Sequence, residues 1–162
     1  MSVPPLLQSS TVSCGPTCLA AIAAYWEKDY AKMVEQSAPA SLAKDFTAAQ
    51  LAEMANELGL RAFTVTATLN LILDNVEKGR PVMVLIRKPP SAPTVRFVFN
   101  GIPTSALADW KARRESHWVI VVGYTSTRII VHDPAAGRLS IPRSTFEEWW
   151  SARRRVALLL TG

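Results

Sequence analysis

The hydrophobic pattern of the chain changes from a helical period to a strand period near residue 80, and this change limits the fold more than any other feature. Before it, apolar residues recur at helical spacing and predict helices over about 16–26, 47–58 and 70–78. After it, short runs have strand character, at 81–86, 94–99, 118–124, 128–132, 138–141 and 155–160. Helices followed by strands predict an α+β fold.

Local signals indicate where two of the helices begin and end. Pro16 suits the first turn of a helix, because its ring holds φ near the helical value. Thr47 and Gln50 form a capping-box pattern at the start of the second helix. Gly59 follows that helix and supplies a stop.

Two later parts of the chain add to this pattern. Ser144 followed by Glu147 is a second capping pattern, which predicts a short helix through Trp150. The stretch over 87–116 is rich in proline and positive charge, and we expect a short helix within it at about 106–113. A loop in this stretch would lie beside the site described below and could select the substrate.

Length and composition predict one folded domain over residues 1–162. The chain is 49% apolar and 19% charged, as is usual for a globular protein, and it is long enough to bury roughly two thirds of its unfolded surface. No run approaches the roughly 20 apolar residues that cross a bilayer, and no secretion signal begins the chain. Two cysteines do not form a disulfide framework. We therefore expect a cytoplasmic protein with no membrane segment.

The net charge of +5 does not by itself indicate a nucleic-acid partner. Basic residues gather in two short clusters, at 111–114 and 153–155, without interleaved aromatic residues. Such clusters usually form a solvated face, so we expect no nucleic-acid binding. An acidic partner protein explains the charge equally well.

Cys14 precedes the first helix and is the first candidate for chemistry. A thiol is a nucleophile only as thiolate, and the positive end of a helix favours a negative charge at that position. A catalytic cysteine also needs a general base, a group that orients the base, and donors for the oxyanion. Without these partners, Cys14 could equally be a small apolar residue.

His117 and Asp133 lie at the outer ends of two predicted strands that are adjacent in sequence, HWVIVVGY and RIIVHD. If residues 125–127 form a three-residue hairpin loop, Tyr124 pairs with Arg128. His117 and Asp133 are then diagonal neighbours on one face, about 7 to 8 Å apart at the backbone. A two-residue loop would move Asp133 to the other face. We favour the three-residue loop because it brings an imidazole within reach of a carboxylate.

Three further residues, His132, Gln8 and Cys18, are candidates for the same site. His132 competes as the base, but on an ideal strand it faces away from Asp133. Gln8 is either an exposed loop residue or a side-chain donor to the oxyanion, helped by the N–H of Cys14. Cys18 lies one helical turn after Cys14. Because a zinc site lacks its other ligands and a disulfide within one turn is strained, we expect Cys18 to be buried packing and expect no metal or cofactor.

Taken together, these residues resemble the bacteriocin-processing cysteine peptidases that cut after double-glycine leaders. The resemblance rests on Gln8, on Cys14 with the apolar helix that follows it, on HWVIVVGY, and on VHDPAAGRLSIPRSTFEEWW. Sixteen positions separate His117 from Asp133, as in that family. The resemblance implies a papain-like fold, in which N-terminal helices pack on a C-terminal antiparallel sheet that carries the histidine and the aspartate.

The resemblance also implies a role for each candidate. Cys14 is the nucleophile, His117 the base and later the acid, Asp133 the orienting carboxylate, and Gln8 the side-chain donor to the oxyanion. The implied substrate is a protein or peptide with a Gly-Gly site. In transporter-borne relatives a membrane-spanning region follows this domain, and its absence here leads us to expect a stand-alone enzyme or an excised domain.

Two biological uses fit such a peptidase. One is maturation of an exported peptide by removal of its leader. The other is an antibacterial effector, delivered into the cytoplasm of a rival cell and restrained by an acidic immunity protein. Two other classes stay open, a transglutaminase-like acyltransferase and a non-catalytic peptide-binding module. Turnover that depends on Cys14 would exclude the last of these.

Overall fold

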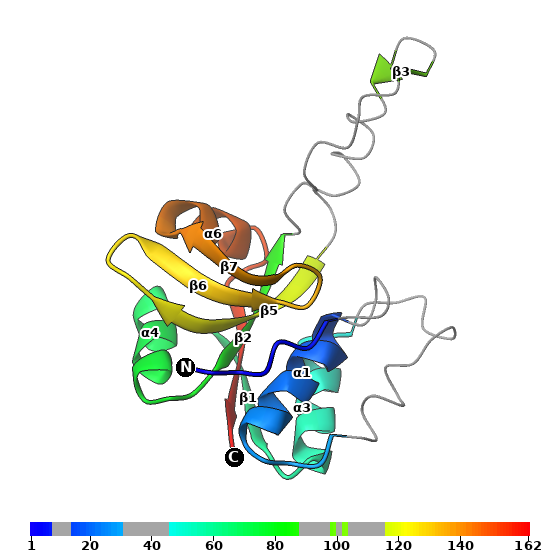
Figure 1. Ribbon diagram of the computed structural model, residues 1–162, viewed down its shortest axis with the longest axis vertical. Coiled ribbons are helices and arrows are strands. Elements are labelled where there is room, and N and C mark those ends of the chain that lie inside the picture. The colour runs from blue at the N-terminus through cyan, green and yellow to red at the C-terminus, as the bar shows by residue number, and fades with distance from the viewer. Residues whose placement is uncertain (8–13, 31–45, 88–97, 100–101, 104–115) are drawn as a thin grey trace.

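A six-stranded sheet with helices on both faces forms the body of the protein (Figure 1). The computed structural model describes residues 1–7, 14–30, 46–87, 98–99, 102–103 and 116–162. The helices are α1 (Cys14–Tyr25), α3 (Ala48–Glu57), α4 (Leu69–Glu77) and α6 (Arg143–Ser151). The strands of the sheet are β1 (Arg61–Thr66), β2 (Val82–Arg87), β5 (Ser116–Tyr124), β6 (Arg128–Asp133), β7 (Gly137–Pro142) and β8 (Val156–Thr161). A separate two-stranded pair consists of β3 (Val98–Phe99) and β4 (Ile102–Pro103).

The strand order in the sheet is β1-β8-β2-β5-β6-β7, and each of these pairings is antiparallel. The C-terminal strand β8 therefore lies between β1 and β2, which come from the first half of the chain. The antiparallel sheet and its packed helices confirm the α+β prediction. The strand β1 was not predicted. None of the six residues of RAFTVT is buried and four are exposed, so the sequence lacks the apolar alternation of a half-buried strand.

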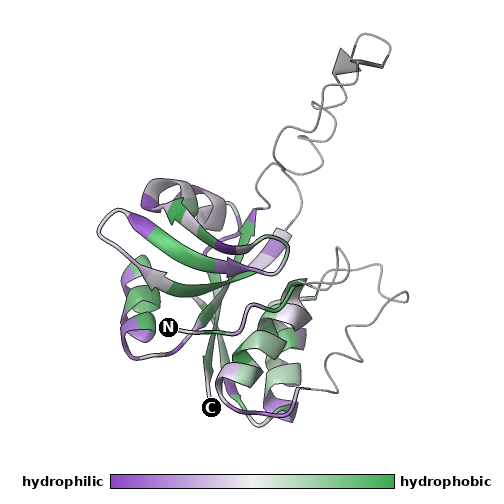
Figure 2. Cartoon of the chain, in the orientation of Figure 1, coloured by the Kyte–Doolittle hydropathy of each residue, from purple (hydrophilic) through white to green (hydrophobic). Residues whose placement is uncertain are grey.

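Side chains alternate between the two faces of the sheet and build two apolar cores. On β5, Trp118 and Ile120 belong to the core under α1 and α3, whereas Val119 and Val121 belong to the core under α4 and α6. The middle strands β2 and β5 are buried on both faces over most of their length. Figure 2 shows the hydrophobic colour in the middle of the sheet. This double burial explains why these runs read as continuously apolar in the sequence.

The helix α1 is buried along almost its whole length. The sequence predicted a single buried face, but residues 14–23 are all buried. The reason is that α1 packs against more than the sheet, since α3 and the N-terminal residues Val3 and Leu6 contact the same core. A helix that is apolar all round is stable only when it is enclosed in this way.

The capping box predicted for the second helix is confirmed. The Thr47 N–H donates to Gln50 Oε1 at 2.9 Å, and the Gln50 N–H donates to Thr47 Oγ1 at 3.2 Å. The stop residue Gly59 has a φ of +74°, which a glycine adopts without strain. The helix α4 is also confirmed, with Thr68 as its N-cap residue.

The capping pattern at Ser144 does not operate as predicted. The helix α6 begins at Arg143, one residue earlier, and its N-cap residue Pro142 makes no side-chain cap bond. The Arg143 N–H instead donates to the carbonyl oxygen of Thr127 at 3.0 Å. A contact from a distant turn thus replaces the local cap. The predicted strand over 94–99 is described only at 98–99, and the predicted helix over 106–113 lies outside the described residues.

Candidate active site

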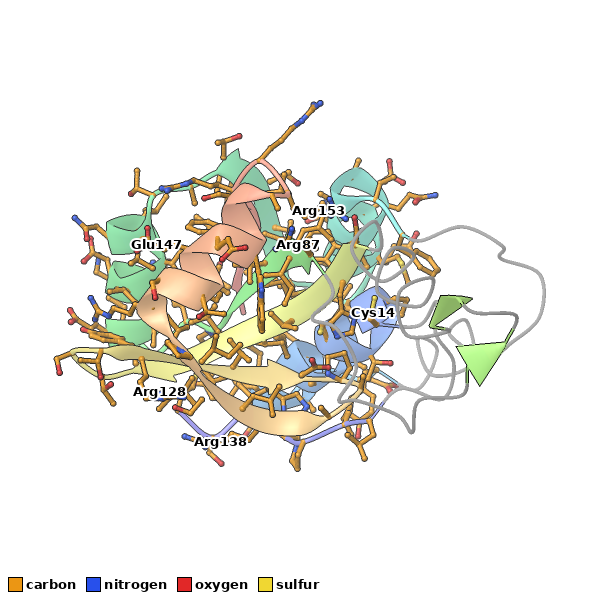
Figure 3. The ribbon with its side chains drawn as sticks, turned by 90° about the horizontal axis from the view of Figure 1, so that it is seen from above. Cys14, Arg87, Arg128, Arg138, Glu147 and Arg153 are labelled. Carbon is orange, nitrogen blue, oxygen red and sulfur yellow. The ribbon has the colours of Figure 1, made fainter. Side chains whose placement is uncertain are left out.

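Cys14 is the first residue of α1, at the end of the helix where backbone N–H groups have no partner within the helix. Its side chain is buried, with 3% of the residue exposed, and its thiol is free. Figure 3 labels Cys14 on the blue helix α1. The helix dipole places partial positive charge at this position.

The hairpin that carries the other two candidates has a tighter turn than predicted. Tyr124 pairs with Ile129, so the predicted pairing of Tyr124 with Arg128 is wrong. The Thr125 N–H donates to the carbonyl oxygen of Arg128 at 2.8 Å, which leaves residues 126–127 as a two-residue loop. By itself, this one-residue change of register would move the side chains of β6 to the opposite face of the sheet, and Asp133 with them.

A β-bulge in β5 reverses that slip. The register shifts by one residue over 121–123, and beyond the shift Ile120 pairs with His132. This is the register that a three-residue loop would have produced. His117 and Asp133 therefore meet on one face after all, because the extra residue in the bulge compensates for the shorter loop.

His117 and Asp133 form a buried hydrogen-bonded pair. His117 Nε2 lies 2.8 Å from Asp133 Oδ1, and each side chain is 5% exposed. An ionised carboxylate only accepts, so Nε2 carries the proton in this bond. The other ring nitrogen, Nδ1, can therefore accept a proton or a hydrogen bond from a third group. Cys14 is close enough to the His117 ring to contribute to its raised pKa.

The turn after β6 holds the carboxylate in place. The Ala135 N–H donates to Asp133 Oδ1 at 2.7 Å, and the Ala136 N–H donates to the Asp133 carbonyl oxygen at 3.2 Å. Gly137 completes the turn with a φ of +82°. The DPAAG sequence thus orients the aspartate through its own backbone. Burial by itself raises the pKa of Asp133. The pKa is nevertheless lowered from 3.8, because the hydrogen bond and charge of His117, together with these backbone N–H groups, outweigh the effect of burial.

The electrostatics of the site favour a protonated His117. Burial of the ring lowers its pKa, but hydrogen bonds and negative charge from Asp133 and Cys14 outweigh burial and raise the pKa from 6.5 to about 9. A nearby negative charge stabilises an imidazolium in this way. The arrangement can therefore hold an imidazolium that is bonded to Asp133 and lies close to Cys14.

The start of α1 is packed closely onto β5. A Cβ added to Gly15 would lie 3.0 Å from both terminal carbons of Leu51 and 3.3 Å from Cδ1 of Trp118. The Trp118 ring also donates its N–H to the carbonyl oxygen of Phe46 at 3.1 Å. Sequence reasoning had not assigned a role to Gly15 or to Trp118. The sequence signal that could have indicated this close packing is the glycine directly after the candidate nucleophile.

The other sequence candidates fall in different places. Cys18 is fully buried and free, and its S–H donates to the carbonyl oxygen of Trp118 at 3.4 Å. Burial raises the pKa of Cys18 well above its ordinary value, as expected for a packing residue. His132 donates its Nε2–H to the carbonyl oxygen of Leu6 at 3.1 Å, away from the pair. Gln8 and most of the stretch over 87–116 lie outside the described residues.

In the parts of the chain that the structure describes, no group of three or more histidine, cysteine, aspartate or glutamate side chains is placed to hold a metal ion. None of the described helices is both long and apolar enough to cross a membrane.

A family model described as "Peptidase_C39 like family" matches residues 1–158. Among curated proteins, none matches the chain. A solved structure described as a C39-like peptidase from Bacillus anthracis is 16% identical with a TM-score of 0.72, over 99% of this chain and 95% of that one.

Two further solved structures are similar along almost the whole chain. A double glycine motif protease from an AMS/PCAT transporter, in complex with its leader peptide, is 20% identical with a TM-score of 0.64, over 98% of this chain and 91% of that one. The peptidase domain of Streptococcus ComA, a bifunctional ABC transporter of a quorum-sensing pathway, is 18% identical with a TM-score of 0.66, over 96% of each chain. At these identities the structural likeness shows the fold alone.

Proposed function

Because the chain belongs to the C39-like peptidase family and is a cysteine peptidase, we propose that Cys14, His117 and Asp133 are its catalytic triad. The observation that carries this proposal is the buried bond of the His117 ring to Asp133, with Cys14 nearby. His117 Nε2 lies 2.8 Å from Asp133 Oδ1, and Cys14 is close enough to contribute to the raised pKa of the ring. Thiol-dependent acyl transfer requires a nucleophile, a base and a group that orients the base, arranged in this order.

The first half of the reaction acylates the enzyme. His117 takes the proton of Cys14 on Nδ1, and the resulting thiolate sulfur attacks the carbonyl carbon of the scissile peptide bond. The negative charge that develops on the carbonyl oxygen is met by the backbone N–H of Cys14 and by the side-chain amide of Gln8. His117 then gives its proton to the departing amine, and a thioester on Cys14 remains.

The second half releases the product. Water enters where the amine left, gives a proton to His117, and attacks the thioester carbonyl carbon. The thiolate leaves, and the second product carries a new carboxylate. Asp133 keeps the ring in one orientation through both halves, because its Oδ1 holds Nε2–H while Nδ1 does the proton transfer.

The substrate we propose is a protein or peptide cut after Gly-Gly. The similar AMS/PCAT peptidase is described as a double glycine motif protease and was solved with its leader peptide. A site that selects glycine must be too narrow for a Cβ atom, and glycine also lets the chain enter in conformations closed to other residues.

Two roles follow from this specificity, leader removal during peptide maturation and cleavage of target-cell proteins as an antibacterial effector. We favour the effector role for a reason that comes from the sequence. The stretch over 87–116 looks longer than the usual passage into the histidine strand of the family. An effector would need an immunity protein in the producing cell. The net charge of +5 suits an acidic partner.

The test compares wild type with Cys14→Ala on peptides that contain Gly-Gly and on a whole proteome, with mass spectrometry of the new termini. Cys18→Ala is the matched control, since it removes the other thiol of the same helix. We expect cleavage to disappear in Cys14→Ala and to persist in Cys18→Ala. Turnover that survives Cys14→Ala would refute the triad. New termini without glycine would refute the specificity, and amide adducts with an added amine would point to an acyltransferase.

The two biological roles need a separate test in cells. Expression of an effector in a bacterial cytoplasm would slow growth, and Cys14→Ala would abolish this effect. Coexpression of a small acidic protein encoded next to this gene would also restore growth. A maturation peptidase would leave growth unchanged and would cut the precursor of an exported peptide.

A further inference from the structure

Trp118 directly follows the proposed base on β5, and the mechanism does not use it. Successive side chains on a strand point to opposite faces, so the Trp118 ring lies on the face of the sheet away from the His117 ring. There it belongs to the core under α1 and α3, and 1% of the residue is exposed. Two neighbours on β5 therefore hold the base on one face and a large buried ring on the other.

The Trp118 ring lies against the first turn of α1, which begins with Cys14. A Cβ added to the next residue, Gly15, would lie 3.3 Å from Cδ1 of Trp118 and 3.0 Å from two carbons of Leu51. Both distances are shorter than ordinary van der Waals contact, so the turn that carries the thiol is in close contact with the ring. Because protein interiors are close-packed, removal of the ring would leave a gap into which this turn can move.

The ring itself is held in place from two sides. Its Nε1–H donates to the carbonyl oxygen of Phe46 at 3.1 Å, directly before the N-cap residue of α3. A buried indole N–H is costly without such a partner, so this bond fixes the orientation of the ring. Leu85, which pairs with Trp118 from β2, packs against the same core. In Figure 1, α1 and α3 lie side by side on this face of the sheet.

We propose that Trp118 is a positioning residue for Cys14 and His117. Its ring sets how closely the first turn of α1 approaches β5, and thereby how far the thiol lies from the imidazole. The proposal rests on the proposed function, in which these two groups exchange a proton. Burial lowers the pKa of His117, and Asp133 and Cys14 together raise it to about 9. The contribution of Cys14 falls with distance, so the pKa of His117 reports where Cys14 lies.

The first test is kinetic. Trp118→Leu removes the ring, whereas Trp118→Phe keeps a ring beside Gly15 and loses only the N–H that bonds Phe46. A misplacement of reacting groups by about 1 Å can cost about 100-fold in rate, so we expect kcat to fall about 10- to 100-fold in Trp118→Leu, with KM nearly unchanged. Trp118→Phe should recover most of this loss. Wild-type kcat in Trp118→Leu would overturn the proposal.

The second test measures the pKa of His117 by NMR titration and does not depend on catalysis. In Trp118→Leu this pKa should fall from about 9 but stay above 6.5, because the bond to Asp133 remains. In the Cys14→Ala background, Trp118→Leu should leave the pKa unchanged, since the group that the ring positions is gone. The same shift in both backgrounds would overturn the proposal, because Trp118 would then act on His117 without Cys14. The absence of any shift in the wild-type background would overturn it as well.

Ile120→Ala is the matched control for simple destabilisation. Ile120 follows Trp118 by two residues on the same face of β5, is fully buried and belongs to the same core. Its truncation leaves a cavity and lowers stability, but it should keep kcat and the pKa of His117 near their wild-type values. Losses equal to those of Trp118→Leu would argue against positioning.

Two further outcomes are separable. If Trp118→Leu does not fold, Trp118→Phe carries both tests, with a smaller fall in kcat and in the pKa of His117 expected, and no change in either would overturn the proposal. Failure of the proposed function would be seen differently, as cleavage that survives Cys14→Ala, and it would leave the NMR result unchanged.

Discussion

Replacing Asp133 with asparagine removes a negative charge from His117 but keeps a side chain of nearly the same shape. In the wild type the pKa of His117 is raised from 6.5 to about 9, although burial of the ring acts in the opposite direction. One pKa unit corresponds to about 1.4 kcal/mol, so this rise stabilises the protonated ring by at most about 3 kcal/mol. Without the carboxylate, burial should dominate, and we expect the pKa of His117 to fall to 6.5 or below.

The assay is an NMR titration of the His117 ring proton on Cε1 in the wild type and in Asp133→Asn. The chain contains only two histidines, so His132 is the single other signal, and His132→Gln assigns it. A pKa of His117 that stays near 9 in Asp133→Asn would refute the reasoning, because the rise would then not come from the carboxylate.

The same pair makes stability depend on pH. A pKa that is higher in the folded state stabilises the fold below the unfolded pKa and stops doing so as pH rises. For His117 this stabilisation of the fold is complete below pH 6.5 and is lost as the pH rises through the folded-state pKa of about 9. Asp133 acts in the opposite sense, since its lowered pKa stabilises the fold above 3.8 and the effect is lost as pH falls below that value. Urea unfolding should show the largest difference between wild type and Asp133→Asn between pH 3.8 and 6.5. A difference that is independent of pH would contradict this.

Three further predictions concern packing and local structure. Thr47→Ala should lower the free energy of unfolding by about 1 kcal/mol through loss of the capping box, and Ser144→Ala, which removes no cap bond, should stay within about 0.5 kcal/mol by urea unfolding. Gly15→Ala places a Cβ atom 3.0 Å from Leu51, so it should displace the start of α1 and lower kcat about tenfold. Adding Leu51→Ala to Gly15→Ala should restore part of kcat, and no restoration would argue against the contact. Arg154 is exposed with a φ of +57°, so Arg154→Gly should raise the free energy of unfolding by about 0.5 to 1 kcal/mol.

Much of the helical part of the fold could be predicted because its signals are local. Thr47 and Gln50 bond each other across one turn, so four residues of sequence are enough to see the cap. Pro16 and Gly59 act through their own backbone angles in the same way. The cap at Ser144 failed because the partner of the Arg143 N–H is a carbonyl group in a distant turn.

The hairpin of β5 and β6 shows a feature that local sequence signals do not predict, the register of the two strands. The turn itself was predicted with a loop one residue too long, since Thr125 pairs with Arg128. Asp133 still lies beside His117, because a bulge over 121–123 restores the register. Bulges carry no strong local signature when the residues around them are all buried and apolar. The strand β1 was missed for a related reason, since it becomes a strand by pairing with β8, about 95 residues later.

By itself, the sequence determined the helices, most of the strands and the residue types of a thiol-dependent site, because propensity, capping and hydrophobic period act over a few residues. The tertiary structure alone decided the register that joins Asp133 to His117, the packing of Gly15 against Leu51 and Trp118, and the bond from His132 to Leu6. These contacts join residues from 16 to 126 positions apart. Their geometry depends on how whole elements pack, since a shift of one residue in a strand moves every side chain to the opposite face.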